Sequence, residues 1–268
     1  MSLNFDGKVA LVTGSSSGLG EAIALLFAAR GARVTLCGRD AERLLKVVDS
    51  ATEISGGHRE RFISVTGDVN EAAARKKIVE ETIKAFGQLD ILVANAGVSI
   101  PNGTLTDATP EIYDQLMNTN VKAVFFLIQE ALPFLEKSRG NIVCMSSMLS
   151  SLVAVPSCIY PMSKAAVDHL ARCLAVELGP KGIRVNTVNP SFIPTRIRRS
   201  YDHNDAWFEK EKAILPLQGL DATAQHVAEA VLFLASDASG FTTGQHLKID
   251  GGRSYAGPFG SPPKPKDN

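Results

Sequence analysis

Residues 8–30 read KVALVTGSSSGLGEAIALLFAAR, and the order of features within this stretch decides the fold class. Consecutive apolar residues at 9–12 predict a short strand covered on both faces, as in a parallel sheet. A glycine-rich turn follows, and helical spacing begins at Glu21. The stretch therefore predicts one strand–turn–helix unit of an α/β protein.

The turn carries its glycines at Gly14, Gly18 and Gly20, in the pattern GxxxGxG. Glycine permits positive φ and lets a ligand approach the backbone, and the start of a helix offers free N–H groups to a pyrophosphate. No GK[ST] follows, so the pattern disfavours a P-loop. The turn indicates a phosphate-binding site, with a tight strand–helix turn that binds nothing as the alternative.

Apolar runs and helical patterns alternate along the rest of the chain. The apolar runs lie at 9–12, 34–37, 62–65, 91–94, 141–145, 185–188 and 247–249. Helical spacing is found at 21–30, 72–86, 112–135, 163–178 and 223–235. This alternation predicts a Rossmann-type, doubly wound α/β fold: a seven-stranded parallel sheet between two helical layers, joined by right-handed crossovers.

One domain over residues 1–252 accounts for these elements. The one long excursion, residues 190–220, contains aromatic residues and predicts a substrate lid, with a surface insertion as the alternative. Residues 253–268 are rich in glycine and proline and predict a loosely ordered tail.

Composition limits the possible functions. The chain has 268 residues, with 28 Lys and Arg against 28 Asp and Glu, so its formal net charge is zero. This balance argues against a nucleic-acid-binding protein, which needs a surplus of basic residues. No apolar run approaches the roughly 18 residues of a membrane-spanning helix. We expect neither a nucleic-acid nor a membrane partner.

The four cysteines and the first residues indicate a cytoplasmic protein. No pair of cysteines has CxxC spacing and no histidine pair lies near them, so we expect reduced thiols and no metal site. The start of the chain lacks the layout of a signal peptide.

The end of the second predicted strand reads Cys37-Gly38-Arg39-Asp40. In a dinucleotide fold the ribose is recognised here, and a carboxylate would repel a 2′-phosphate. Gly38 leaves room for that phosphate and Arg39 can pair with it, so NADP(H) is favoured over NAD(H). Asp40 could instead cap the next helix or turn back to the ribose, and Arg39 could be an ordinary surface charge.

Tyr160 and Lys164 are four residues apart and therefore share one face of a predicted helix. A tyrosine that acts as a general acid near neutral pH must lower its pKa from about 10 toward about 7, which a desolvated ammonium can promote. Ser147 follows the strand at 141–145, where its hydroxyl could hold a carbonyl oxygen that gains charge. Each signal is weak alone.

Together these residues resemble the short-chain dehydrogenase/reductase family, and within it the carbonyl reductases that are similar to 3-oxoacyl-carrier-protein reductase. The resemblance runs from Lys8 to about Gly252. Its ordered motifs are TGxxxGxG at 13–20, Asp68-Val69, Asn95-Ala96-Gly97, Asn120, Ser147 with Tyr160 and Lys164, Asn189-Pro190 and Asp250-Gly251-Gly252.

The resemblance implies a role for each matching residue. Tyr160 would be the acid/base, Lys164 would lower its pKa and bind the nicotinamide ribose, Ser147 would orient the carbonyl, and Asn120 would hold a water beside Lys164. The implied cofactor-binding residues are Gly14, Ser16, Ser17, Gly18, Leu19, Gly20, Arg39, Asp68, Val69, Asn95, Ala96, Gly97, Tyr160, Lys164, Pro190, Ser191, Ile193 and Thr195.

Two positions leave alternatives open. Ser146 lies beside Ser147, and the separation of thirteen residues from Tyr160 favours Ser147. Where the family has Pro-Gly after the sixth strand, this chain has Pro190-Ser191, and serine cannot adopt every glycine conformation.

The expected substrate is a small, largely apolar carbonyl compound or secondary alcohol. Its site would be lined by Ser147, Leu149, Ile159, Tyr160, Phe192 and Trp207. Arg196, Arg198 and Arg199 could instead receive a carboxylate, a phosphate or an acyl-carrier group. The resemblance also implies a homotetramer or homodimer. The alternative function is a cofactor-binding regulator or scaffold, which would not need all four catalytic groups.

Overall fold

Seven parallel strands form one sheet in the computed structural model, which describes residues 3–101, 103–153, 157–198, 209 and 212–256. Their order is β3-β2-β1-β4-β5-β6-β7. The strands span β1 (Val9–Thr13), β2 (Arg33–Gly38), β3 (Phe62–Thr66), β4 (Ile91–Ala94), β5 (Asn141–Met145), β6 (Arg184–Pro190) and β7 (His246–Ile249). The predicted Rossmann-type fold is confirmed. The order reverses between β1 and β4, and in open α/β sheets such a reversal opens a crevice at the carboxyl ends of the strands.

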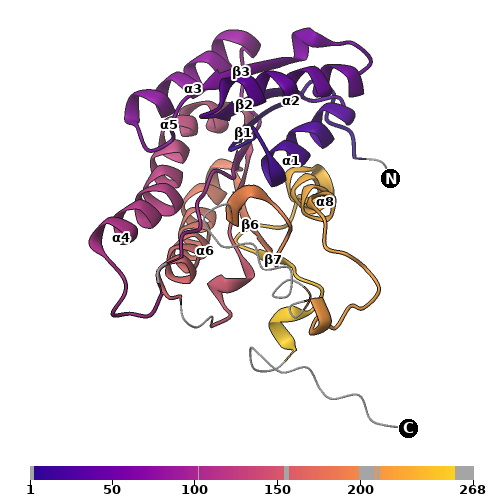
Figure 1. Cartoon of the computed structure of the whole chain (residues 1–268). Coiled ribbons are helices and arrows are strands. Elements are labelled where there is room, and N and C mark those ends of the chain that lie inside the picture. The colour runs from indigo at the N-terminus through magenta and orange to yellow at the C-terminus, as the bar shows by residue number, and fades with distance from the viewer. Residues whose placement is uncertain (1–2, 102, 154–156, 199–208, 210–211, 257–268) are drawn as a thin grey trace.

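Helices cover both faces of the sheet (Figure 1). One face carries α1 (Gly18–Ala29), α2 (Ala41–Ile54) and α8 (Ala224–Ala235), and the other carries α3 (Ala72–Phe86), α5 (Ala123–Ser138) and α6 (Ile159–Leu178). Strand residues alternate between the two resulting cores. Ala10 and Val12 of β1 pack under α1 and α8, whereas Val9 and Leu11 pack under α3, α5 and α6. This two-sided burial is the reason that the strands read as continuous apolar runs.

The helical run expected at 112–135 differs from the prediction. The structure divides it into α4 (Pro110–Met117), a π-helical turn η2 (Asn118–Lys122) and α5. A π-helical turn adds one residue to a helix and shifts the face that the following side chains occupy. Asn120 lies inside this turn and is fully buried.

Some of the predicted segments lie partly outside the described residues. Residues 199–208 and 210–211 of the predicted lid, Trp207 among them, and residues 257–268 of the predicted tail are not described. Across the residues that are described, no helix is long and apolar enough to cross a membrane, and no cluster of His, Cys, Asp or Glu could hold a metal ion.

The core holds one hydroxyl that is costly to bury. Thr35 of β2 has no exposed surface, and its Oγ1 finds no hydrogen-bond partner among the described residues. Thr82 of α3 is equally buried, but its Oγ1 donates to the carbonyl oxygen of Ile78 at 2.7 Å.

We therefore expect Thr35→Val to raise the free energy of unfolding by about 1–2 kcal/mol, because it removes an unpaired buried hydroxyl without changing the shape of the side chain. The matched control Thr82→Val should lower it by about 1 kcal/mol. Urea denaturation of the three proteins measures both effects. An equal loss of stability in the two variants would contradict the argument.

Candidate functional site

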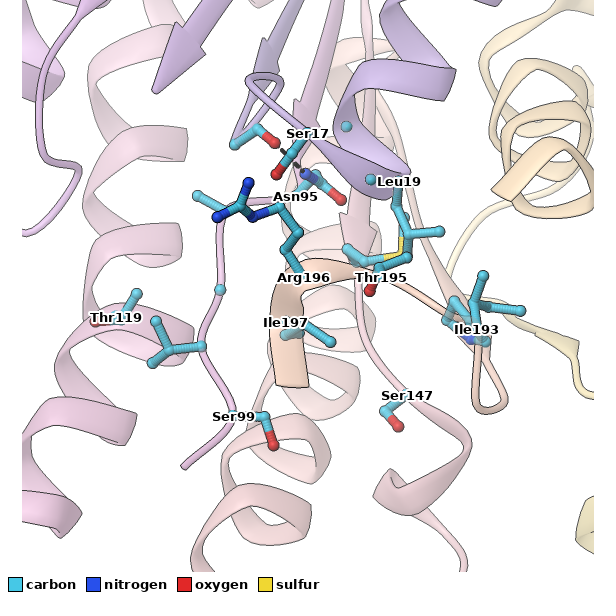
Figure 2. Close-up of a pocket in the computed structure, with 18 of the residues that line it drawn as sticks. Ser17, Leu19, Asn95, Ser99, Thr119, Ser147, Ile193, Thr195, Arg196 and Ile197 are labelled. Carbon is cyan, nitrogen blue, oxygen red and sulfur yellow. Dashed lines mark hydrogen bonds between the residues drawn. The ribbon is translucent and has the colours of Figure 1, made fainter. Parts of the chain in front are cut away.

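A cavity of about 370 Å³ lies along the carboxyl edge of the sheet. We call it the edge cavity. Its walls come from the segments that follow β1, β2, β3, β4, β5 and β6 and from the start of α6. Figure 2 shows its length: Ser17 lies at one end, and Ser99 and Ser147 lie at the other. The cavity therefore occupies the crevice that the strand order opens.

The glycine-rich turn forms the first end of the edge cavity. Gly14 has φ of +67°, and a methyl group at Gly20 would run into the carbonyl oxygen of Gly14. The backbone can be this compact only because both residues are glycine. Gly18, the first residue of α1, lines the cavity, and a Cβ built on it would lie 3.2 Å from Thr195 Cβ.

Thr13 and Asn95 join the ends of β1 and β4 beneath this turn. Asn95 Nδ2 donates to the carbonyl oxygen of Thr13 at 2.8 Å. Thr13 Oγ1 accepts from the backbone N–H groups of Asn95 and Ala96, both at 3.1 Å. The asparagine amide is thus committed to the two strands at the reversal point.

Three arginines meet beside the glycine-rich turn. A second pocket, the arginine pocket, is lined by Ser16, Ser17, Arg39, Asp40, Ala41, Arg43 and Arg196. Asp40 caps α2: its Oδ1 accepts from Arg43 N at 3.1 Å, and its Oδ2 lies 3.1 Å from Arg43 Nε. Of the two alternatives for Asp40, the structure has the helix cap. Figure 2 shows Arg196 directed toward the turn that bears Ser17.

Tyr160 and Lys164 lie in the first two turns of α6, against the end of β5. Lys164 is only 3% exposed, and its Nζ donates to the carbonyl oxygen of Met145 at 2.9 Å. The same Nζ is 5.7 Å from the centre of the Tyr160 ring. Burial lowers the pKa of Lys164 to about 8, while Asp168 acts in the opposite direction. The group is therefore still mostly protonated near pH 7.

The two candidate serines make different contacts. Ser146 Oγ donates to the carbonyl oxygen of Lys164 at 3.2 Å. Ser147 Oγ accepts from Leu149 N at 3.2 Å and retains its own proton for donation. Both residues line the edge cavity, together with Tyr160 and Lys164.

Asn120 lies behind the cavity wall. Its Oδ1 accepts from Val98 N at 2.9 Å, and its Nδ2 lies 3.0 Å from both the carbonyl oxygen of Val98 and Ser163 Oγ. A Cβ built on Gly97 would lie 3.2 Å from Asn120 Oδ1 and 3.4 Å from Lys164 Nζ. The amide and the ammonium therefore flank the same narrow space at Gly97.

Most of the predicted site residues line the edge cavity. They are Gly14, Ser16, Ser17, Gly18, Leu19, Gly20, Arg39, Val69, Asn95, Ala96, Gly97, Ser147, Leu149, Tyr160, Lys164, Pro190, Ser191, Phe192, Ile193 and Thr195. Ser191 needs no glycine conformation, because Arg139 is the one non-glycine residue with positive φ in the described part of the chain.

The remaining predicted residues lie elsewhere. Ile159 is buried in a small core with Val98 and Leu116 and not in the cavity wall, because the first turn of α6 directs it inward. Asp68 sits beside the cavity, its Oδ2 3.7 Å from Arg39 Nη1. Sequence reasoning missed Ser99, Thr119 and Ser157, which line the cavity; Ser99 could have been inferred because it closely follows Asn95–Gly97 after β4.

Comparison with known proteins agrees with this geometry. A family model described as enoyl-(acyl carrier protein) reductase matches residues 14–254. A glucose 1-dehydrogenase from Gluconobacter oxydans is 36% identical over 257 residues, which is 95% of each chain. A 3-oxoacyl-[acyl-carrier-protein] reductase from Thermotoga maritima is 35% identical over 253 residues, covering 93% of this chain and 99% of that protein.

A solved structure of a short-chain dehydrogenase/reductase is also similar to this chain. The crystal structure of a short-chain dehydrogenase/reductase of unknown function from Caenorhabditis elegans, described with cofactor, superposes with a TM-score of 0.86. It is 34% identical, and the match covers 93% of this chain and 96% of that one. The chain belongs to the short-chain dehydrogenase/reductase family. As a member of this family of oxidoreductases it takes a small-molecule substrate.

Because Lys164 is buried, the free energy of unfolding of this short-chain dehydrogenase/reductase depends on pH. The unfolded lysine has the ordinary pKa of 10.5, whereas the folded one has a pKa of about 8. Between these values only the unfolded chain holds the proton, so the free energy of unfolding rises with pH across this window. The difference corresponds to about 3 kcal/mol.

Lys164→Met removes this contribution. We expect the stability of the variant relative to the wild type to fall by about 3 kcal/mol between pH 7 and pH 10.5, because the wild type no longer buries a charge at high pH. Denaturant unfolding at several pH values measures the difference. Lys77→Met, which changes an exposed lysine of α3, is the control and should show no such trend. A pH-independent difference for Lys164→Met would overturn the assigned pKa.

Proposed function

We propose that the protein is an NADP(H)-dependent oxidoreductase that moves hydride between the nicotinamide and a carbonyl/secondary alcohol pair, with Tyr160 as general acid and base. The observation that carries the proposal is the placement of Tyr160, Lys164 and Ser147 on one wall of the edge cavity, with a buried ammonium beside the tyrosine ring. A protein that only bound the cofactor could use Lys164 to hold the ribose but would not need the serine and tyrosine hydroxyls beside it.

The residues divide the proton chemistry between them. During reduction the Tyr160 hydroxyl donates its proton to the carbonyl oxygen, and during oxidation the phenolate accepts it back. The Lys164 ammonium favours the phenolate and so lowers the pKa of the tyrosine. Ser147 donates to the substrate oxygen as its charge grows. We assign this role to Ser147 because the Ser146 hydroxyl is bonded to the backbone of α6.

Asn120 supports the proton path. Because its Oδ1 and Lys164 Nζ flank the same space at Gly97, a water held there would connect the ammonium with solvent. This placement supports the role that the family resemblance implies for Asn120.

The edge cavity fits a nicotinamide dinucleotide, which supplies or accepts the hydride when it is bound. The compact turn at Gly14, Gly18 and Gly20 and the N-terminus of α1 would hold the pyrophosphate. Further along, Lys164 would bind the nicotinamide ribose. Segments at the two ends would complete the site: Asp68, Val69 and Asn95–Gly97 for the adenosine, and Pro190, Ser191, Ile193 and Thr195 for the carboxamide.

The preference for NADP(H) rests on the arginine pocket. Its arginines carry N–H groups that can donate to a 2′-phosphate beside the contacts that Arg43 makes with Asp40 and Arg39 makes with Asp68, and Asp40 caps α2. Gly38 at the end of β2 offers no carboxylate, and a Cβ there would already lie 3.1 Å from Ser16 Oγ. The end of β2 therefore carries no acidic side chain that would repel a 2′-phosphate, which supports NADP(H).

Apolar side chains support a largely apolar substrate. Leu149, Met148, Phe192 and Ile197 line the edge cavity. They do so together with Ser147, Tyr160 and Lys164, which we call the catalytic wall. Related proteins are described as acting on compounds as different as glucose, borneol and versicolorin. The natural substrate therefore has to be found with a panel that includes sugars, terpene alcohols, polycyclic aromatic ketones and 3-oxoacyl thioesters.

Exposed apolar residues support self-association. Val176 of α6 is 80% exposed and Phe125 of α5 is 44% exposed. We propose a homodimer or homotetramer in which these two helices are covered.

Tyr160→Phe tests the assigned chemistry. We expect turnover on the panel to fall at least about a thousandfold, because phenylalanine holds no proton, while the Kd for NADPH measured by fluorescence stays within about twofold. Retained turnover would remove Tyr160 from the mechanism. NADPH binding by the wild type with no turnover of any panel compound would favour a cofactor-binding regulator.

Arg39→Ala tests the cofactor preference. Loss of a charge-assisted contact to phosphate should raise the KM for NADPH about tenfold and leave that for NADH nearly unchanged. Steady-state kinetics with both cofactors measure the ratio. Arg61→Ala, which removes the same charge just before β3 at the opposite edge of the sheet, is the control. Equal effects of Arg39→Ala on both cofactors would contradict phosphate pairing.

A further inference from the structure

A cluster of buried polar side chains lies behind the catalytic wall, between α6, β6 and β7. It consists of Asp168, Thr187, Asn189 and His246, and we call it the Asp168 network. Asp168 is 7% exposed, and Thr187 and Asn189 are fully buried. The proposed reaction uses none of these groups, although burying a carboxylate is expensive unless it is well paired.

The hydrogen bonds of the network run in one direction. Arg172 Nη1 lies 3.1 Å from His246 Nε2, and a guanidinium can only donate, so Nε2 accepts. His246 Nδ1 therefore carries the proton and donates to Thr187 Oγ1 at 2.9 Å. Burial lowers the pKa of His246, which keeps the imidazole neutral. The Thr187 hydroxyl then donates to Asn189 Oδ1 at 2.6 Å, with Asp168 Oδ1 3.2 Å away.

The network ends on the turn that carries Ser147. Asn189 Nδ2 lies 3.1 and 3.0 Å from the two oxygens of Asp168, which fixes the orientation of the amide. The same nitrogen lies 3.2 Å from the carbonyl oxygen of Ser147 and 3.0 Å from Ser150 Oγ. These two acceptors bracket η3 (Met148–Ser150), the short helical turn that Ser147 caps.

The network also influences Lys164, through the charge of Asp168. Asp168 follows Lys164 by one helical turn, and its charge raises the pKa of the ammonium against the effect of burial. One carboxylate thus faces both the amide that holds Ser147 and the lysine that serves Tyr160.

We propose that Asp168, Thr187 and Asn189 are positioning residues that hold the Ser147 turn against the catalytic wall, so that the serine hydroxyl and the Tyr160 hydroxyl can reach the same substrate oxygen. The catalytic part of this inference rests on the proposed function. The structural part, that the network immobilises residues 147–150, does not.

Thr187→Val and Thr187→Ser form the test pair. Valine keeps the shape and the β-strand preference but leaves Asn189 Oδ1 without its donor, whereas serine keeps the hydroxyl. For the panel carbonyl with the highest kcat/KM, we expect Thr187→Val to lower kcat about tenfold with the KM for NADPH within about twofold, because a misplaced serine impairs the chemical step and not cofactor binding. Thr187→Ser should restore kcat to within about threefold.

A second readout does not depend on activity. Hydrogen exchange measured on peptides that cover residues 147–152 should be at least about fivefold faster in Thr187→Val and close to wild type in Thr187→Ser. Thr82→Val, with a buried hydroxyl outside the network, should change neither exchange in this segment nor kcat. This readout decides the positioning claim even if the wild type reduces no panel carbonyl, in which case the proposed function fails separately.

Three results would overturn the inference. They are unchanged exchange at 147–152 in Thr187→Val, equal impairment in Thr187→Val and Thr187→Ser, and a parallel loss of kcat and NADPH affinity. The last would mean that the variant loosens the whole cavity and not the serine turn alone.

Discussion

The contacts between Thr13 and Asn95 are the interaction on which the rest of the site depends. They close the gap between β1 and β4, the two neighbouring strands whose following segments diverge to opposite sides of the sheet. Without this link, the glycine-rich turn after β1 and the Asn95–Gly97 segment after β4 would lack a fixed separation. The turn can come close to Asn95 only because Gly20 has no side chain. The half-buried Asn95 amide and the buried Thr13 hydroxyl therefore fix the separation of the two strand ends at the centre of the edge cavity.

The buried position of Lys164 lowers the stability of the fold at neutral pH, and under the proposed function it serves the chemistry. Lys164 is a cation buried between α6 and β5, with a backbone carbonyl as its described hydrogen-bond acceptor. Such a position lowers its pKa, which by itself would weaken its charge. Asp168 opposes that effect from one helical turn away, and the two oxygens of its carboxylate accept from Asn189 Nδ2 at 3.1 and 3.0 Å. The Asp168 network thus forms one electrostatic unit with Lys164. Its members come from α6, β6 and β7, and β7 is far from the other two elements in the sequence.

Several features could be predicted from the sequence because each depends on residues close together in the chain. Burial on both faces gives β1, β4 and β5 their apolar runs, and the glycine-rich turn identifies its own strand and helix. The family resemblance then placed most of the lining residues. Other features could not be predicted, because they depend on geometry that no local pattern encodes. In the sequence, Leu116, Ala123 and Leu127 keep steps typical of a continuous helix across Asn118–Lys122, so no pattern in 112–135 marks the π-helical turn. Ile159 differs from Tyr160 only by its rotation about α6, and the partners in the Asp168 network are up to 78 positions apart, from Asp168 to His246.

The arginine pocket draws its three cations from separate pieces of chain: the tip of β2, the first turn of α2 and the segment after β6. None of them lies on the wall that carries Tyr160 and Lys164. Under the proposed function, mutations in the arginine pocket can therefore accumulate without replacing Tyr160 or Lys164, and the opposite is also true. The proposed function would then separate two evolutionary variables, the cellular redox pool that the enzyme draws on and the compound that it transforms, so that a lineage can change one while inheriting the other intact.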